Sequence, residues 1–394
     1  MKRILFLFNH DAAHQVAHLT GVARAMALDH PDIETIVAVA PPIAAIVAQQ
    51  MGVDAVGRVT WITLDLPPLI NIAGMVLDRL FPARRLARLR YFAPLFAGVD
   101  MLVSTERTCL RAKAHIRGRQ PLFAAIPHGA GDRNVSYHAD YTRFDVVLVA
   151  GAKVADAMRG IGVAADRLVI VGYPKFDTIA ANIAGNAAAR PTAKLFDNDR
   201  PVVVYNPHFD PHLSSWYDHG PAILHWFAGP GAGRFNLVFA PHVMLFRKRW
   251  HISPEYRTVR RRPDIPAEAL GAANILVDVD GPRLFDMTYM TRSTIYLGDM
   301  SSQIYEFLQT PRAAIFIDSH DGRVTEPEAN HLHWRAGPVA STIDDVVAQL
   351  GDWQAVADRY RAAQRQLFAQ TFDISAVPAT VRAARALVDA IAGR

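Results

Sequence analysis

Short apolar runs alternate with helical stretches along most of the 394 residues, and this alternation constrains the fold more than any other feature. The run at residues 3–8 is almost entirely apolar, which is typical of a strand buried on both faces of a sheet. Residues 15–27 follow it with apolar side chains at helical spacing. Such alternation predicts a parallel sheet covered by helices. Further strands are expected at residues 35–40, 59–64, 101–104, 122–126, 146–149 and 168–171.

The pattern restarts after a polar, alanine-rich passage at residues 182–200. We therefore predict an α/β protein of two doubly wound, Rossmann-like domains, residues 1–178 and 179–394, the second ending in helices. Ligands of such sheets bind at the carboxyl ends of the strands, so we expect both sheets to face one cleft. The second set of strands is expected at residues 202–205, 236–240, 275–277, 295–297 and 313–317, and the last helices at 353–372 and 376–391.

Composition excludes several classes of protein. Hydrophobic residues make up 51% of the chain and charged residues 20%, which excludes a disordered chain. The net charge of +5 is a mild excess that does not indicate a nucleic-acid partner. The single cysteine, Cys109, excludes an internal disulfide and a cysteine-based zinc site. The first apolar run is too short for a signal peptide and no uncharged run reads as a membrane span, so we expect a cytoplasmic protein.

A serine pair follows the strand expected at residues 295–297. The sequence Asp299-Met300-Ser301-Ser302 leads into an apolar helix that carries Glu306. Hydroxyls and backbone N–H groups at the start of a helix favour an anion. The alternative is a plain helix cap by one of the two serines.

Two histidines also follow expected strands. His242 comes after Pro241 with Arg247 in the next turns, and it can donate a hydrogen bond to a phosphate. His128 lies on a glycine-rich turn, where an imidazole can serve as general base for a hydroxyl, and Asp132 can orient it. The alternatives are a histidine that caps a loop and a solvated basic face.

Sixteen histidines raise the question of a metal. His208, Asp210 and His212 follow one strand, and His331 and His333 form a second group. Pro211 disrupts helical presentation of the first group, and no third ligand has the spacing of a known motif. We therefore predict no metal site and place His208 or Asp210 in a donor pocket instead.

Taken in chain order, these motifs resemble those of the CDP-glycerol glycerophosphotransferases, the teichoic-acid polymerase and primase relatives with a GT-B fold. The resemblance covers residues 128–317 and is strongest over 284–308. The sequence departs from the family pattern at Met300, Ala240 and Ala130, which leaves room for a different CDP-alditol or a nucleotide sugar. The junction motif of the family is matched by Gly172, Pro174 and Asp177.

The resemblance implies that residues 1–178 form an acceptor domain and residues 179–394 a nucleotide-donor domain. It also implies roles for particular residues. Ser301 and Ser302 would hold the donor pyrophosphate with help from His242, and Glu306 would bind the ribose. His128 would be the catalytic base. The full set of predicted catalytic residues is His128, His242 and Asp132, and that of donor-binding residues is Ser301, Ser302, Glu306, Asp299, His208 and Arg247.

The predicted function is transfer of glycerol phosphate, or a related alditol phosphate, from a CDP-linked donor to a hydroxyl of a membrane-lipid or glycan acceptor. No cofactor is expected. Three alternatives stay open, because fold alone does not separate them. They are a GT-B glycosyltransferase that uses a UDP-sugar or another nucleotide sugar, a UDP-sugar epimerase, and a non-catalytic nucleotide-binding or partner-binding protein.

Residues 66–97 mix long apolar stretches with five arginines. A basic amphipathic segment of this type can lie on an anionic bilayer, which would make the protein peripheral on the inner face of the cell membrane. The alternative is an ordinary helix pair packed on the first domain with solvated arginines. The arginines are Arg79, Arg84, Arg85, Arg88 and Arg90.

Overall fold

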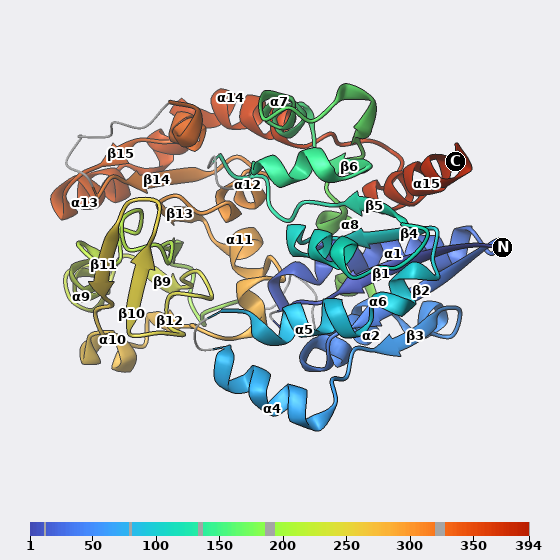
Figure 1. The fold of residues 1–394 in the computed structure, drawn as a ribbon. Helices are drawn as coiled ribbons and strands as arrows, with labels where there is room; N and C mark the ends of the chain where they lie inside the picture. Colours follow the sequence, from blue (N-terminus) through green and yellow to red (C-terminus); the bar gives the residue numbers. More distant parts are fainter. Residues whose placement is uncertain (12, 79–80, 133–136, 186–193, 320–327, 394) are drawn as a thin grey trace. The chain divides into compact units, whose positions relative to one another are not determined.

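The computed structural model describes residues 1–11, 13–78, 81–132, 137–185, 194–319 and 328–393. The chain forms two compact units (Figure 1). Unit 1 comprises Met1–His128, Tyr137–Ala187 and Gln370–Arg394, and unit 2 comprises Gly129–Ser136 and Ala188–Ala369.

Unit 1 is built on a seven-stranded parallel sheet with the order β3-β2-β1-β4-β5-β6-β7. The order runs outward in both directions from β1, as in a doubly wound fold. The strands are β1 (Lys2–Phe8), β2 (Ile33–Val39), β3 (Thr60–Thr63), β4 (Met101–Ser104), β5 (Leu122–Ala125), β6 (Val146–Val149) and β7 (Leu168–Ile170). The helices are α1 (Ala17–Asp29), α2 (Ala44–Met51), α3 (Val53–Val56), α4 (Pro68–Leu77), α5 (Ala83–Tyr91), α6 (Ala93–Ala97), α7 (Ala152–Gly160), α8 (Pro174–Gly185) and α15 (Ala379–Ala392).

The core of unit 1 joins the start and the end of the chain. Side chains of β1 are buried from Ile4 onward, and α1 packs against both α8 and the C-terminal helix α15. Asp177 on α8 accepts hydrogen bonds from the backbone N–H and the hydroxyl of Thr380 at the start of α15. Gly172, with φ +86°, lets Asp373 and Arg382 approach closer than a side chain would permit. The junction motif around Gly172 and Asp177 therefore anchors the C-terminal helix.

Unit 2 has a six-stranded parallel sheet with the order β12-β9-β8-β13-β14-β15. Relative to β8, its first strand, this is the Rossmann order 3-2-1-4-5-6. The strands are β8 (Val202–Asn206), β9 (Asn236–Phe239), β12 (Ile275–Val277), β13 (Ile295–Gly298), β14 (Ala313–Ile317) and β15 (Val339–Ala340). Between β9 and β12 in the sequence, β10 (Trp250–Ser253) and β11 (Thr258–Arg261) form a separate antiparallel pair. The helices are α9 (Gly220–Ala228), α10 (Ala267–Gly271), α11 (Thr288–Arg292), α12 (Gln303–Phe307), α13 (Ile343–Gly351) and α14 (Trp353–Thr371).

The alternation of strands and helices coincides with the predicted one, and both units are Rossmann-like. The β10–β11 hairpin was not predicted, because its side chains are largely exposed at Trp250, Ile252 and Val259 and the buried-strand pattern is absent there. Strand β15 was not predicted either, because it is only two residues long. The predicted division of labour, with an acceptor domain and a donor domain, stays a prediction.

Candidate functional site

Three strand ends in unit 2 carry most of the predicted donor-binding residues. His242 follows β9, His208 follows β8 and Asp299 follows β13. These strands are neighbours in the sheet, and β8–β13 is the point where its crossover connections diverge. Ligands of doubly wound sheets bind at this switch point because loops leave it in opposite directions. The predicted residues therefore gather at the expected end of the sheet.

Asp299 holds this end of unit 2 together. One carboxylate oxygen accepts the backbone N–H of His208 at 2.8 Å. The other accepts the backbone N–H and the hydroxyl of Ser215, at 2.7 and 2.8 Å. Burial raises the pKa of Asp299 to about 7, although these hydrogen bonds oppose the shift. With both oxygens engaged inside the unit, Asp299 acts on the loop after β8, and direct contact with a donor stays a prediction.

His208 and His242 carry their protons on the same ring nitrogen. The Nδ1 atom of His208 accepts the backbone N–H of Asp210 at 3.1 Å, and that of His242 accepts the backbone N–H of Met244 at 3.2 Å. A ring nitrogen that accepts cannot also carry the proton, so each neutral imidazole has its N–H at Nε2. The two rings lie 5.3 Å apart between centroids. In this tautomer Nε2 of each ring is a hydrogen-bond donor.

The two serines differ in their contacts, and an anion-binding role for the pair stays a prediction. The hydroxyl oxygen of Ser301 accepts the backbone N–H of Gln303, the first residue of α12, at 3.3 Å, and its side chain is buried. Ser302 is the N-cap residue, but its side chain makes no capping hydrogen bond. Ser302 is exposed, and a Cβ at Gly129 or Gly131 would come within 3.3 or 3.1 Å of its side chain. Two glycines thus let the loop at residues 129–131 pass close to Ser302.

Glu306 and Arg247 differ in exposure. Glu306 on α12 is buried, 4% exposed. Arg247 is exposed and forms no ion pair with any residue that the structure describes. Their predicted roles toward a donor stay predictions.

Asp132 has partners other than the predicted one. Its carboxylate accepts the hydroxyl of Tyr305 at 2.5 Å, and its other oxygen lies 2.9 Å from both the backbone N–H and Nδ1 of His333. All three side chains belong to unit 2. This differs from the expectation that Asp132 orients His128, whose Nδ1 instead faces a backbone carbonyl in unit 1. The Nε2 atom of His333 is buried and has no hydrogen-bond partner among the described residues.

His128 follows β5 in unit 1 and is held by two residues that the sequence analysis did not single out. Its Nδ1 lies 3.3 Å from the carbonyl oxygen of Thr105, which can only accept. The Thr105 hydroxyl donates to Oε1 of Gln15 at 2.9 Å, and the amide nitrogen of Gln15 lies 3.4 Å from Nε2 of His128. This arrangement places the His128 proton on Nδ1 and leaves the Nε2 lone pair as the acceptor.

The surroundings of His128 favour its neutral form. The residue is exposed as a whole, but desolvation of its ring by the surrounding protein lowers the pKa of His128 from the ordinary histidine value. Burial also lowers the pKa of His18, whose ring centroid is 6.3 Å from that of His128. A neutral imidazole whose Nε2 carries no proton is the form that can take a proton from a hydroxyl.

His128 opens into a pocket of about 510 Å³ within unit 1. The pocket is lined by Gln15, Thr105, Glu106, Arg107, Thr108, Leu110, Arg111, His128, Asp140, Tyr141 and Arg143. Thr105 and Glu106 directly follow β4, so polar residues after that strand were the signal that could have found them. Gln15 precedes α1 and gave no such signal.

Among the described residues, no group of three or more His, Cys, Asp or Glu side chains is placed to hold an ion. Cys109 is buried, and burial raises the pKa of its thiol. No helix in the described part of the chain is both long and apolar enough to cross a membrane.

No family model matches the sequence, and no curated protein does. Solved structures do match. The wall teichoic acid polymerase TagF, in a variant soaked with CDPG, is 12% identical with a TM-score of 0.61, and the match covers 100% of this chain and 88% of that one. The UDP-GlcNAc 2-epimerase of Neisseria meningitidis bound to UDP-GlcNAc is 12% identical with a TM-score of 0.60, over 100% of both chains. MnaA of S. aureus, in complex with UDP, is 12% identical with a TM-score of 0.60, over 99% of this chain and 96% of that one. At this level of identity the likeness shows the fold, and it confirms the predicted GT-B class.

Proposed function

We propose that the protein transfers glycerol phosphate, or a related alditol phosphate, from a CDP-linked donor to a hydroxyl of an acceptor. The observation that carries the proposal is the opposite placement of protons in the two units. His128 offers a lone pair at Nε2, whereas His208 and His242 each offer an N–H there. Transfer needs one base for the acceptor and fixed donors for the phosphates.

The proposed chemistry follows from these groups. The acceptor hydroxyl gives its proton to Nε2 of His128 as its oxygen forms a bond to the donor phosphorus nearest the alditol. The bond from that phosphorus to the bridging oxygen breaks, and CMP leaves with the electron pair. His242 donates from Nε2 to the pyrophosphate, and the hydroxyls of Ser301 and Ser302 assist. Each fixed donor stabilises charge where it develops, without reorganisation.

In this proposal unit 1 supplies the base and the acceptor pocket, and unit 2 supplies the donor site. Glu306 is assigned to the ribose and Arg247 to the phosphates. Asp132 is assigned an indirect role, in which its hydrogen bonds position His333 and Tyr305. Asp299 is assigned the role of holding the loop that carries His208.

A second candidate is chemistry on a nucleotide sugar, either glycosyl transfer or epimerisation. The observation in its favour is that the neighbours bound to UDP and to UDP-GlcNAc are matched over 96% and 100% of their own lengths. The two candidates share a pyrophosphate and differ in the base of the nucleotide and in the need for an acceptor.

Ligand-dependent thermal unfolding separates these candidates. We expect CMP and CDP-glycerol to raise the midpoint by several degrees, which is roughly the effect of a ligand at 100 times its Kd, and UDP and UDP-GlcNAc to have little effect. His128→Ala should keep this stabilisation and lose transfer by ~10²–10⁴-fold. Stabilisation by uridine nucleotides alone would favour the second candidate over the first. Full turnover by His128→Ala would show that His128 is not the general base.

We also propose that the protein is cytoplasmic and peripheral on a membrane, through the apolar side chains of α4 rather than through arginines. Leu69 and Ile72 are 83% and 61% exposed, and α4 lies beside α5 at the edge of unit 1 (Figure 1). Insertion of such side chains into a bilayer interface removes them from water. The other exposed apolar residues of the helix are Ile70, Met75, Val76 and Leu77.

The arginines of the same segment are largely used inside unit 1. Arg84 pairs with Asp78 and Arg85 with Glu106, while the buried Arg88 pairs with Asp11 at 2.9 Å. Arg90 is exposed, and Arg79 lies outside the described residues. Vesicles of mixed neutral and anionic lipid should pellet the protein. Leu69→Glu with Ile72→Glu should abolish pelleting, and the control Val53→Glu, at a site 93% exposed, should not. Equal pelleting of both variants would overturn the assignment to α4.

A further inference from the structure

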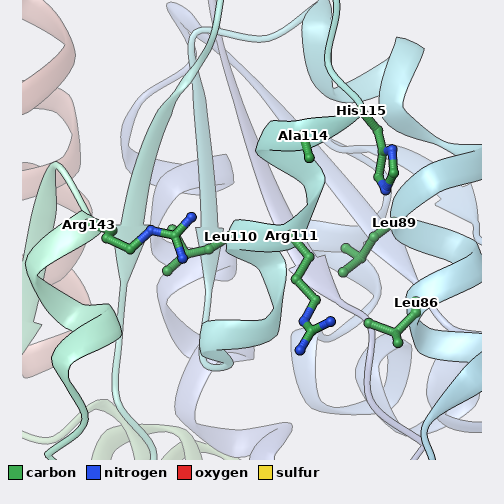
Figure 2. Close-up of a pocket in the computed structure, with 7 residues that line it drawn as sticks. All are labelled: Leu86, Leu89, Leu110, Arg111, Ala114, His115 and Arg143. Carbon is green, nitrogen blue, oxygen red and sulfur yellow. The ribbon is translucent and has the colours of Figure 1, made fainter.

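A second pocket in unit 1, of about 410 Å³, lies between α5 and the short helix Arg107–Ala114 (Figure 2). Leu86 and Leu89 come from α5, and Leu110 comes from the short helix. Leu89 and Leu110 belong to the core, yet each also contributes to the wall of this opening. The floor of the pocket is therefore aliphatic and reachable from outside.

The rim of this pocket is cationic. Arg111 and Arg143 are both exposed, and no acidic residue lines the pocket with them. Arg111 forms no ion pair with any residue in the described ranges. Arg143 reaches Asp140 only at 3.4 Å, in an exposed pair that is worth little. Both guanidinium groups can therefore pair with an anionic ligand.

The apolar pocket adjoins the pocket of His128. Leu110, Arg111 and Arg143 line both, so they form a shared wall. Together the two pockets present aliphatic side chains, two guanidinium groups and the basic nitrogen of His128, and Glu106 and Asp140 also line the His128 pocket. A ligand that matched the first three features would have a hydrocarbon segment, an anionic group and a hydroxyl.

We propose that the pocket of Leu86, Leu89 and Leu110 binds the hydrocarbon segment of an amphipathic acceptor whose anionic group pairs with Arg111 and Arg143. The proposal rests on the proposed function in one respect, namely that the acceptor hydroxyl is delivered to His128. A phosphate monoester or diester of an alcohol with an aliphatic chain has the required chemistry. Burial of each methylene should improve affinity by about two- to fourfold until the pocket is filled.

Cysteine protection locates the ligand. Ala114 lines the pocket and is exposed, so Ala114→Cys should react with a maleimide. The background is low because Cys109, the single native cysteine, is buried. Octyl phosphate should slow labelling of Ala114→Cys, with a weaker effect from butyl phosphate and little from octanol or inorganic phosphate. Ala165→Cys, exposed elsewhere on unit 1, should label at the same rate with and without octyl phosphate.

Charge variants test the second half of the proposal. Arg111→Gln should weaken protection by octyl phosphate about tenfold, the usual effect of losing one charge-assisted hydrogen bond. Arg117→Gln, another exposed arginine outside both pockets, should leave protection unchanged. Equal protection by octanol and octyl phosphate would overturn the role of the arginines. Unchanged labelling with every probe would overturn the pocket itself.

The assay distinguishes this inference from the proposed function. The labelling assay needs no nucleotide and no turnover, so a failure of octyl phosphate to protect Ala114→Cys would bear only on the pocket. Failure of CDP-glycerol to bind would remove the proposed reaction and leave the protection result standing. Octyl phosphate in solution also separates binding of a single amphipathic molecule from adsorption to a membrane surface, which α4 would mediate.

Discussion

His128 in unit 1 and His208 and His242 in unit 2 all follow parallel strands, yet their rings are held in opposite ways. A backbone carbonyl faces Nδ1 of His128, whereas a backbone N–H faces Nδ1 of the other two. The main chain therefore sets the tautomer, and with it the chemistry of Nε2, in each unit separately. The same residue type becomes an acceptor in one unit and a donor in the other.

Glutamine in place of each histidine should show the difference between the two units most clearly. The amide N–H of glutamine can replace a donor at Nε2, but no amide can replace a base. His128→Gln should therefore lose ~10²–10⁴-fold in kcat, while His242→Gln should keep donor binding and lose less than about tenfold. Steady-state kinetics and titration with the nucleotide measure the two effects.

His242→Ala is the matched control, since it removes the donor as well as the ring. It should weaken nucleotide binding more than His242→Gln does. If His128→Gln and His242→Gln lost turnover equally, the different proton placement would have no functional meaning.

How far the sequence predicted this arrangement depends on the kind of contact. The strands and the placement of His128, His208, His242 and Asp299 after them followed from apolar periodicity and from the rule that ligand sites lie at strand ends. Those signals are local, because a strand and the turn after it are adjacent in the sequence.

The partners that decide each role were not predictable. Gln15 lies 113 residues from His128, Ser215 lies 84 residues from Asp299, and His333 lies 201 residues from Asp132. No spacing rule joins residues at such separations, because their proximity is a consequence of sheet order. Closeness in sequence was also a poor guide to contact. Asp132 was expected to orient His128, four residues before it, but its carboxylate contacts Tyr305 and His333.

Asp299→Asn should change how the stability of the protein depends on pH. The pKa of Asp299 is raised from 3.8 in the unfolded chain to about 7 in the folded protein. Between these values the folded state binds the proton and the unfolded state does not, so stability falls as pH rises from about 4 to about 7. From pH 5 to pH 8 this should cost on the order of 2 kcal/mol in the wild type. The variant should lack that slope and bind nucleotide several-fold more weakly, because an amide cannot accept all three bonds.

Denaturant unfolding at the two pH values measures the slope. Ser215→Ala is the control, because it removes one hydroxyl bond and keeps the titrating carboxyl. It should keep the pH dependence that Asp299→Asn loses. An unchanged slope in Asp299→Asn would assign the pH dependence to other groups.

The smallest effect is expected from changes at Gln15, whose amide contacts the proposed base, His128. The Gln15 amide N–H faces Nε2 of His128, and Thr105 fixes the amide by donating to its oxygen. Gln15→Glu would put a carboxylate where the N–H was, which favours the imidazolium and raises the pKa of His128. The acidic limb of the kcat/KM profile should then move to higher pH by about one unit. Gln15→Met removes the amide without adding charge, so it should lower kcat a few-fold and leave the limb in place. A limb that moved equally in both variants would show that packing around the ring, rather than the Gln15 contact, sets the basicity of His128.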